Sequence, residues 1–306
     1  MKIGCGLPVS GAWATPANIT AFGTLAEELG YASLWTFQRL LVPEGSAMDA
    51  VYRSVLDPMA ALAFAAATTS RIRLGVAVIN APYVSPAYLA KQAATVDILS
   101  AGRLDLGLGL GWMPEEFAAT GGSMERRGAR TEEYIRVLRT LWGPQPTEFS
   151  GEFYTVPLGT TLPAPVQSGG PKILLGGTAP AALRRVGRLA DGWVTSSRAD
   201  LSRIGESIDI VRSAAAAAGR DPAAVSIICR GVVRSGEPVT GNDGQRVLLS
   251  GSFGQITEDV AWLAGNGVTE VFFDLNWDPM IGSPAADPVA ATDRAASLLE
   301  ALQPGT

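Results

Sequence analysis

Two kinds of segment alternate along the chain from one end to the other. Short apolar runs of strand length are each followed by a longer stretch in which apolar residues recur at helical spacing. Eight of the short runs are predicted to be strands, at residues 2–7, 32–37, 72–80, 103–109, 172–176, 192–195, 225–233 and 268–274. Strands that alternate with helices form parallel sheets with crossover helices, so the pattern predicts an α/β fold.

Eight helices are predicted, near residues 16–30, 57–69, 86–100, 129–142, 179–190, 200–219, 254–266 and 284–303. Several begin at a capping residue followed by proline, as at Thr15-Pro16 and Ser85-Pro86. The cap accepts an unpaired backbone N–H, and proline in the first turn loses no hydrogen bond. Eight strand–helix pairs predict a closed TIM-type (β/α)₈ barrel, in which residues 1–306 form a single domain.

Two segments interrupt the alternation. Residues 38–56 form a loop after the second strand, and residues 143–171 form an insertion before strand five that is rich in Pro, Gly and Thr. Loops of this length in a compact domain are usually functional or mobile. The first follows the C-terminal end of a strand, where barrel active sites lie, whereas the second precedes a strand.

Composition narrows the class of protein. Of 306 residues, 47% are hydrophobic and 17% are charged, which is enough apolar material for a large core. The net charge of −5, without a basic block, argues against nucleic-acid binding. No apolar run is long enough to span a membrane, and the N-terminus resembles a strand rather than a signal peptide. Both cysteines lie in strand-like runs and are expected to be buried thiols in a reducing cytoplasm.

The chain contains no histidine. This excludes Ser-His-Asp and Cys-His catalysis and histidine-ligated metal sites, so no metal is expected. Two of the three lysines, Lys2 and Lys172, precede apolar strands, and Lys91 lies in a helix, so no lysine is placed for a Schiff base. An enzyme with this composition would depend on an organic cofactor for much of its chemistry.

Two strand ends carry glycine-rich motifs. Residues 107–112 read GLGLGW, where small residues would let a ligand approach the backbone, although they also fit a simple strand end. The motif is not a dinucleotide fingerprint, because Trp112 stands where glycine is required. Gly176, Gly177 and Thr178 precede a predicted helix, whose free N–H groups favour a phosphate. Thr178 would either donate to that anion or cap the helix.

Two further strand ends carry candidate side chains. Gln38 and Arg39 are the first strongly polar pair after the second strand. Arg39 would hold an anionic group in the barrel mouth or remain a solvated loop charge. At the end of the third strand, Ala77, Val78 and Asn80 would face the mouth.

Three separated stretches carry a resemblance to a known family. They are residues 74–121, which include Leu-Ser-x-Gly-Arg-Leu at 99–104, residues 151–154 (GEFY), and residues 171–193. In this order they resemble the luciferase-like monooxygenases, particularly the branch that uses coenzyme F420. The resemblance covers nearly the whole chain and implies a deazaflavin or flavin ring at the C-terminal mouth of the barrel, in a homodimer.

The resemblance also implies roles for particular residues. Ala77-Val78 falls where members carry a non-proline cis peptide against the ring, and Gly176, Gly177 and Thr178 fall on the cofactor phosphate. The residues that it assigns to the cofactor are Ala77, Val78, Asn80, Gly109, Leu110, Gly111, Glu115, Gly176, Gly177 and Thr178.

The chain departs from the family at the end of the second strand. Many F420-dependent members carry Asp-His there, whereas this chain carries Gln38-Arg39. Neither residue is a general base near neutral pH, so the proton would come from solvent, or Arg39 would act electrostatically.

The resulting hypothesis is an F420-dependent oxidoreductase that moves a hydride between deazaflavin C5 and a small organic substrate. Trp13, Trp112 and Trp277 are candidate pocket walls. The alternatives are an FMN-dependent monooxygenase, a flavin-binding barrel without turnover, and a cofactor-free lyase or isomerase.

Overall fold

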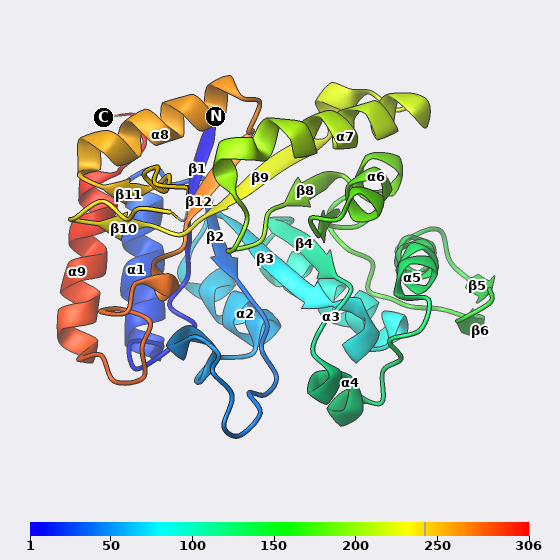
Figure 1. Ribbon diagram of the computed structural model, residues 1–306. Helices are drawn as coiled ribbons and strands as arrows, with labels where there is room; N and C mark the ends of the chain where they lie inside the picture. Colours follow the sequence, from blue (N-terminus) through cyan, green and yellow to red (C-terminus); the bar gives the residue numbers. More distant parts are fainter. Residues whose placement is uncertain (242, 306) are drawn as a thin grey trace.

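Eight parallel strands close into a barrel in the order β1-β12-β9-β8-β7-β4-β3-β2 (Figure 1). The computed structural model describes residues 1–241 and 243–305. The barrel strands are β1 (Lys2–Gly6), β2 (Ser33–Thr36), β3 (Arg73–Asn80), β4 (Leu104–Gly109), β7 (Lys172–Gly176), β8 (Gly192–Val194), β9 (Ser226–Gly231) and β12 (Glu270–Phe273). Each lies within two residues of its predicted range, and the TIM-type barrel is confirmed.

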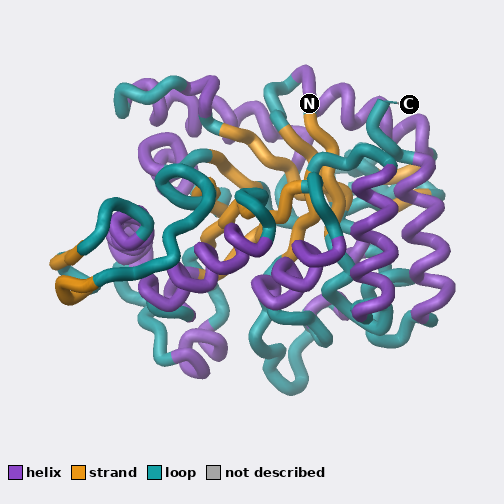
Figure 2. Tube along the Cα trace, turned by 180° about the vertical axis from the view of Figure 1, so that it is seen from behind, coloured by secondary structure: helices purple, strands orange, loops and turns teal. Residues whose placement is uncertain are grey.

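Helices surround the strands on the outside of the barrel (Figure 2). They are α1 (Pro16–Glu28), α2 (Pro58–Thr68), α3 (Pro86–Leu99), α4 (Pro114–Thr120), α5 (Arg127–Leu141), α6 (Pro180–Leu189), α7 (Ile204–Ala217), α8 (Phe253–Gly265) and α9 (Pro288–Ala301). The predicted caps form, because the side chains of Thr15, Asp57 and Ser85 accept backbone N–H groups from the first turns of α1, α2 and α3. The short helix α4 was not predicted.

The insertion at 143–171 lies outside the helical layer. It contains an antiparallel pair, β5 (Thr147–Ser150) and β6 (Thr155–Gly159), beside α5 and away from the barrel (Figure 1). The Glu133 carboxylate of α5 accepts the backbone N–H groups of Phe153 and Tyr154, at 2.7 and 2.8 Å, which attaches the hairpin to the helix. A second unpredicted pair, β10 (Arg234–Ser235) and β11 (Ser250–Gly251), lies in the connection from β9 to α8.

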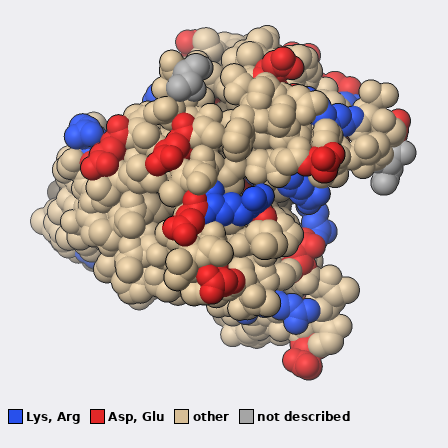
Figure 3. Space-filling model, turned by 90° about the vertical axis from the view of Figure 1, so that its left-hand side faces the viewer, with Lys and Arg blue, Asp and Glu red and all other residues tan. Residues whose placement is uncertain are grey.

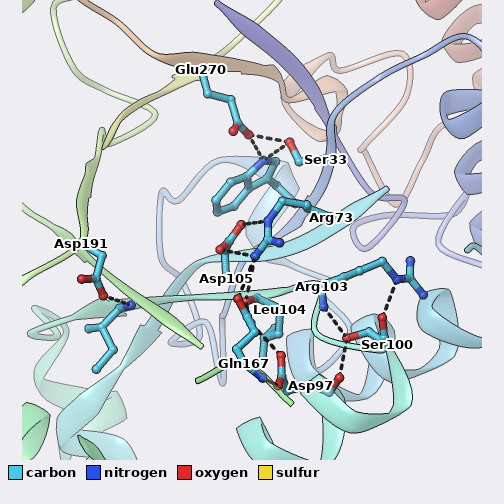
Figure 4. A network of polar contacts seen from close by, with 12 residues as sticks. Ser33, Arg73, Asp97, Ser100, Arg103, Leu104, Asp105, Gln167, Asp191 and Glu270 are labelled. Atoms are coloured by element: carbon cyan, nitrogen blue, oxygen red, sulfur yellow. Dashed lines mark hydrogen bonds and ion pairs between the residues drawn. The ribbon is translucent and has the colours of Figure 1, made fainter. Parts of the chain in front are cut away.

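Polar contacts occupy the amino end of the barrel (Figure 4). Arg73 donates to both carboxylate oxygens of Asp105, at 2.7 and 2.6 Å, and Glu270 accepts from Ser33 and from the Trp35 indole. Burial raises the pKa of Glu270. Lys2 and Lys172 line a small cavity at this end, so they lie away from the carboxyl ends of the strands, as expected.

Cys5 and Cys229 are buried free thiols, as predicted. Burial raises the pKa of the Cys229 thiol to about 12 and moves that of Cys5 higher still. Among helices within 1–241 and 243–305, none is long and apolar enough to cross a membrane.

Glu27 joins α1 to the chain that enters β3, and it carries a pH-dependent part of the stability. Burial alone would raise its pKa, but the backbone N–H groups of Ile72, Arg71 and Ser70 donate to the carboxylate and bring the pKa down to about 2. A carboxyl group whose pKa is lower in the folded state stabilises the fold at pH values above its ordinary pKa. This contribution is lost as the pH falls towards the lowered pKa. The relevant window therefore extends from about pH 4.5 down to about pH 2.

We accordingly expect Glu27→Gln to lower the free energy of unfolding at neutral pH. The variant should also lose less of this free energy than the unmodified protein as the pH falls through the acidic window. Urea unfolding at about pH 7 and about pH 3 measures both effects. Glu28→Gln is the matched control, because Glu28 is the exposed neighbour on the same helix. Equal pH dependence of the Glu27→Gln variant and the unmodified protein would contradict the assignment.

Candidate active site

The side chains predicted from three strand ends meet at the carboxyl end of the barrel. The Asn80 N–H at the end of β3 donates to the Gln38 side-chain oxygen at 2.9 Å. The Asn80 side-chain oxygen in turn accepts the Gly111 N–H at 3.1 Å. Gln38, Asn80 and Gly111 thus connect the ends of β2, β3 and β4 by hydrogen bonds, which fixes the backbone on this side of the mouth.

The floor of the mouth is built around Val78. The peptide between Ala77 and Val78 is cis, as the resemblance predicted. A Cβ added at Gly109 would lie 2.6 Å from Val78 Cγ2 and 2.7 Å from the Asn80 side-chain oxygen. At Gly176 it would lie 3.4 Å from Val78 Cγ1. Gly109 on β4 therefore leaves room that Val78 occupies, whereas a Cβ at Gly176 on β7 would make only ordinary van der Waals contact with Val78.

Arg39 forms a buried ion pair with Glu116 of α4. The Arg39 Nη1 lies 3.0 Å from Glu116 Oε2, and these side chains are only 6% and 1% exposed. The other carboxylate oxygen of Glu116 accepts the Leu40 N–H at 2.9 Å. The guanidinium lies over the rings of Tyr52 and Trp112, at 4.6 and 5.2 Å from their centroids. Arg39 therefore attaches the 38–56 loop to α4 and is not a solvated charge.

The two neighbouring glutamates of α4 differ in their exposure to solvent. Glu115, assigned to the cofactor by resemblance, is exposed, whereas Glu116 is buried against Arg39. Sequence reasoning did not identify Glu116, because without a predicted helix the two faces could not be distinguished. Nearby, burial and then the charge of Glu116 raise the pKa of Tyr83 to about 12, so its hydroxyl keeps its proton near neutral pH.

Sequence reasoning also missed Arg230 and Asp274, at the ends of β9 and β12. The Arg230 Nε donates to Asp274 Oδ2 at 2.7 Å, and both residues are buried. The Arg230 Nη1 donates to the Ala77 carbonyl at 3.4 Å, and the guanidinium packs 4.8 Å from the Phe37 ring centroid. An arginine inside an apolar strand needs a counter-ion, and that requirement was the available signal.

Gly177 and the start of α6 lie at the end of β7. Gly177 has a φ of +127°, and its carbonyl accepts the Trp193 indole N–H at 2.8 Å. The residue at the cap position is Ala179, and no side chain caps the helix. The alternative in which Thr178 caps α6 is therefore wrong, and the exposed Thr178 hydroxyl is left available to a ligand. In this first turn Pro180 has no N–H, and the N–H groups of Ala182 and Leu183 donate to the Ala179 carbonyl at 2.8 and 3.0 Å. The Ala181 N–H and the positive end of the helix dipole are what this turn offers an anion.

The three candidate tryptophans lie in different environments. Trp13 is fully buried and packs edge-on against Phe22, at 5.5 Å between ring centroids. Trp112 is 59% exposed beside Arg39. Trp277 is partly buried and packs against Tyr52 at 5.3 Å. Trp112 and Trp277 therefore flank the mouth, whereas Trp13 contributes to the core.

Comparison with known proteins agrees with this geometry. Residues 3–239 match the family model described as luciferase-like monooxygenase. The chain belongs to the luciferase-like monooxygenase family. An uncharacterized protein of Mycobacterium tuberculosis is 34% identical over 218 residues, which cover 68% of this chain and 76% of that protein.

Similar proteins differ in the cofactor that their names state. An FMNH(2)-dependent dimethylsulfone monooxygenase of Pseudomonas putida is 31% identical over 198 residues, 64% of this chain and 52% of that protein. Among solved structures, the monooxygenase RslO1 of Streptomyces bottropensis has a TM-score of 0.78 at 23% identity, over 99% of this chain and 98% of that one. The coenzyme F420-dependent tetrahydromethanopterin reductase of Methanopyrus kandleri has a TM-score of 0.77 at 15% identity, with the same coverage. These structural likenesses establish the fold, and family membership supports an oxidoreductase that uses a flavin or deazaflavin.

Proposed function

We propose that the protein is an F420-dependent oxidoreductase that transfers a hydride between deazaflavin C5 and a small organic substrate. The observation that carries the phosphate-bearing cofactor is the uncapped start of α6 after Gly177, at the same barrel mouth as the Val78 floor. The choice of F420 over FMN rests on the resemblance of the sequence to the F420-dependent branch. The Ala181 N–H and the helix dipole suit a phosphate, and the apolar floor formed by Val78 suits a flat ring. The exposed Thr178 leaves space for a cofactor tail to continue into solvent.

The chain's own residues would bind and orient the cofactor. Gly176, Gly177 and Thr178 would hold the phosphate, while Val78 would contact the ring face. When bound, the deazaflavin supplies the two-electron hydride chemistry. Gln38 would act as a positioning residue, because its side chain holds the Asn80 backbone in place.

Electrostatics of the mouth favour hydride transfer over acid–base chemistry. Two carboxylates at the mouth, Glu116 and Asp274, are each paired with an arginine. Arg39 is committed to Glu116 and would also act by positioning, through α4 and the 38–56 loop. The proton that accompanies the hydride would therefore come from solvent.

The second candidate is an FMN-dependent monooxygenase. Identity of 31% to an FMNH(2)-dependent enzyme favours it, and the start of α6 would serve the phosphate of FMN equally well. A flavin-binding barrel without turnover is the third candidate, and it would bind a reduced cofactor without reoxidising it.

Reoxidation of the reduced cofactor separates these candidates. Reduced F420 should be reoxidised without oxygen when a panel of enones and imines is supplied as hydride acceptors. If the protein with reduced FMN and oxygen instead converts a substrate to an oxygenated product, the monooxygenase candidate replaces the proposal. If neither reduced cofactor reacts with any acceptor despite binding, the protein binds the cofactor without turnover.

A further inference from the structure

The 38–56 loop and the segment after β8 together span the mouth of the barrel. The loop leaves the end of β2 and extends past the lower end of the barrel in Figure 1. Its Asp49 Oδ2 lies 3.0 Å from Arg198 Nη2, four residues beyond the end of β8. The barrel order places β8 four strands away from β2 in either direction, so the two strands stand on opposite sides of the barrel. A contact between the segments that follow them therefore bridges the opening.

The loop is anchored at both of its ends. Its start is held by α4 through the Arg39–Glu116 ion pair. Its end is held by the chain after β1, because the Gly11 N–H donates to the Ser54 carbonyl at 2.9 Å. Between these anchors, residues 41–48 form no hydrogen bond or ion pair with the rest of the described chain outside the loop. The contact with the segment after β8 is thus what attaches the middle of the loop across the mouth.

The Asp49–Arg198 ion pair is much more exposed than the anchor at α4. The Asp49 and Arg198 side chains are 50% and 71% exposed, whereas those of Arg39 and Glu116 are 6% and 1% exposed. An exposed ion pair contributes little to stability and is screened by salt, whereas a buried pair is costly to break. The attachment across the mouth therefore opens more easily than the anchor at α4.

Two cavities adjoin the exposed pair. Arg198 lines a cavity of about 640 Å³, and Asp49 lines one of about 180 Å³. Arg234 lines both cavities, and Trp277, which flanks the mouth, lines the smaller one. In Figure 3, which faces the side that carries β10 and β11, Lys and Arg side chains lie beside Asp and Glu side chains around a hollow. The loop therefore has open space beside it in which to move once the pair is broken.

We infer that the 38–56 loop is a gate over the barrel mouth, and that the Asp49–Arg198 ion pair is the latch that holds it closed. Opening of the gate sets the rate at which a ligand enters and leaves the mouth. The inference rests on the proposed function for the identity of that ligand, which is the cofactor. It assigns a role to Asp49 and Arg198, which the proposed function does not use.

Stopped-flow binding of F420 tests the latch. Asp49→Asn should raise the association and dissociation rates about threefold each and leave the Kd nearly unchanged, because an open gate speeds both directions. Glu44→Gln is the matched control. It removes the same charge from the same loop, but Glu44 is exposed and has no ion-pair partner in the described chain. Equal rates for the two variants would overturn the latch.

A covalent latch gives a stronger test of the gate. Asp49→Cys/Arg198→Cys, joined by a bismaleimide with a reducible linker, should slow both rates at least about tenfold, and reduction of the linker should restore them. The two native cysteines are buried, so the introduced thiols react selectively. Arg203→Cys/Glu206→Cys is the control, because that exposed ion pair lies at the start of α7. Unchanged rates in the linked Asp49/Arg198 variant would overturn the gate.

Access to the floor of the mouth separates the gate from the proposed function, because this readout needs no cofactor. Val78→Cys places a thiol at the floor, and its alkylation by neutral iodoacetamide is followed. Adding Asp49→Asn should raise the alkylation rate about threefold, whereas adding Glu44→Gln should leave it unchanged. If neither F420 nor FMN binds but Asp49→Asn speeds alkylation, the proposed function fails and the gate stands. If F420 binds and Asp49→Asn changes neither its rates nor the alkylation, the gate is overturned and the proposed function stands.

Discussion

Replacing Gly177 by aspartate is expected to weaken binding of a phosphate-bearing cofactor about 30-fold more than replacing it by alanine. Both side chains share the same backbone cost, because φ is +127° and a Cβ would lie 2.8 Å from the Ala182 Cβ. Only aspartate adds a negative charge at the start of α6, where the phosphate is proposed to bind. The difference between the two variants therefore measures the effect of the added carboxylate, its charge together with its greater size.

Fluorescence titration of Gly177→Asp and Gly177→Ala with F420 and with FMN gives this difference. Gly169→Asp is the control for a charge added at a glycine of positive φ elsewhere, since its φ is +76° and no atom lies within 4 Å of an added Cβ. It should bind the cofactor like the unmodified protein. Equal affinities of Gly177→Asp and Gly177→Ala would show that no phosphate lies at this helix start.

Replacing Glu116 by alanine is expected to lower the free energy of unfolding by about 3 kcal/mol. The variant leaves the Arg39 guanidinium buried, with only 6% of its side chain exposed and its carboxylate partner removed. It also removes the acceptor of the Leu40 N–H, so the 38–56 loop loses its attachment to α4.

Urea unfolding of Glu116→Ala beside Glu115→Ala measures this cost. Glu115 is exposed on the same short helix, and its substitution should change stability by less than about 0.5 kcal/mol. The double variant Arg39→Ala/Glu116→Ala should be more stable than the sum of its single variants implies, because it leaves no unpaired buried charge. Equal stabilities of the two single glutamate variants would contradict a structural role for the Arg39–Glu116 pair.

The barrel was predictable because its signals are local. Short apolar runs indicated the strands. A capping residue before proline indicated the starts of helices, as at Thr15 and Ser85. Helix α4 was not predicted because it lacks these local signals. It is short, begins at Pro114 without a side-chain cap, and follows a glycine-rich strand end. Its absence from the prediction left Glu115 and Glu116 indistinguishable.

The site was less predictable because its contacts join distant parts of the chain. Gln38 could be named as a polar residue at a strand end, but its bond to Asn80 spans 42 residues. Arg230 and Asp274 lie 44 residues apart, on neighbouring strands whose pairing becomes known only when the barrel closes. The resemblance to a family predicted the cis peptide between Ala77 and Val78, which no local pattern would have indicated.

Titration of the purified apo-protein with F420 and with FMN, followed by fluorescence, distinguishes the two cofactors. We expect F420 to bind with a Kd of about 1 μM or tighter and FMN to bind at least about tenfold more weakly. Tighter binding of FMN would move the assignment to an oxygen-using monooxygenase. Binding of neither cofactor would contradict the proposed cofactor site and leave only the barrel fold established.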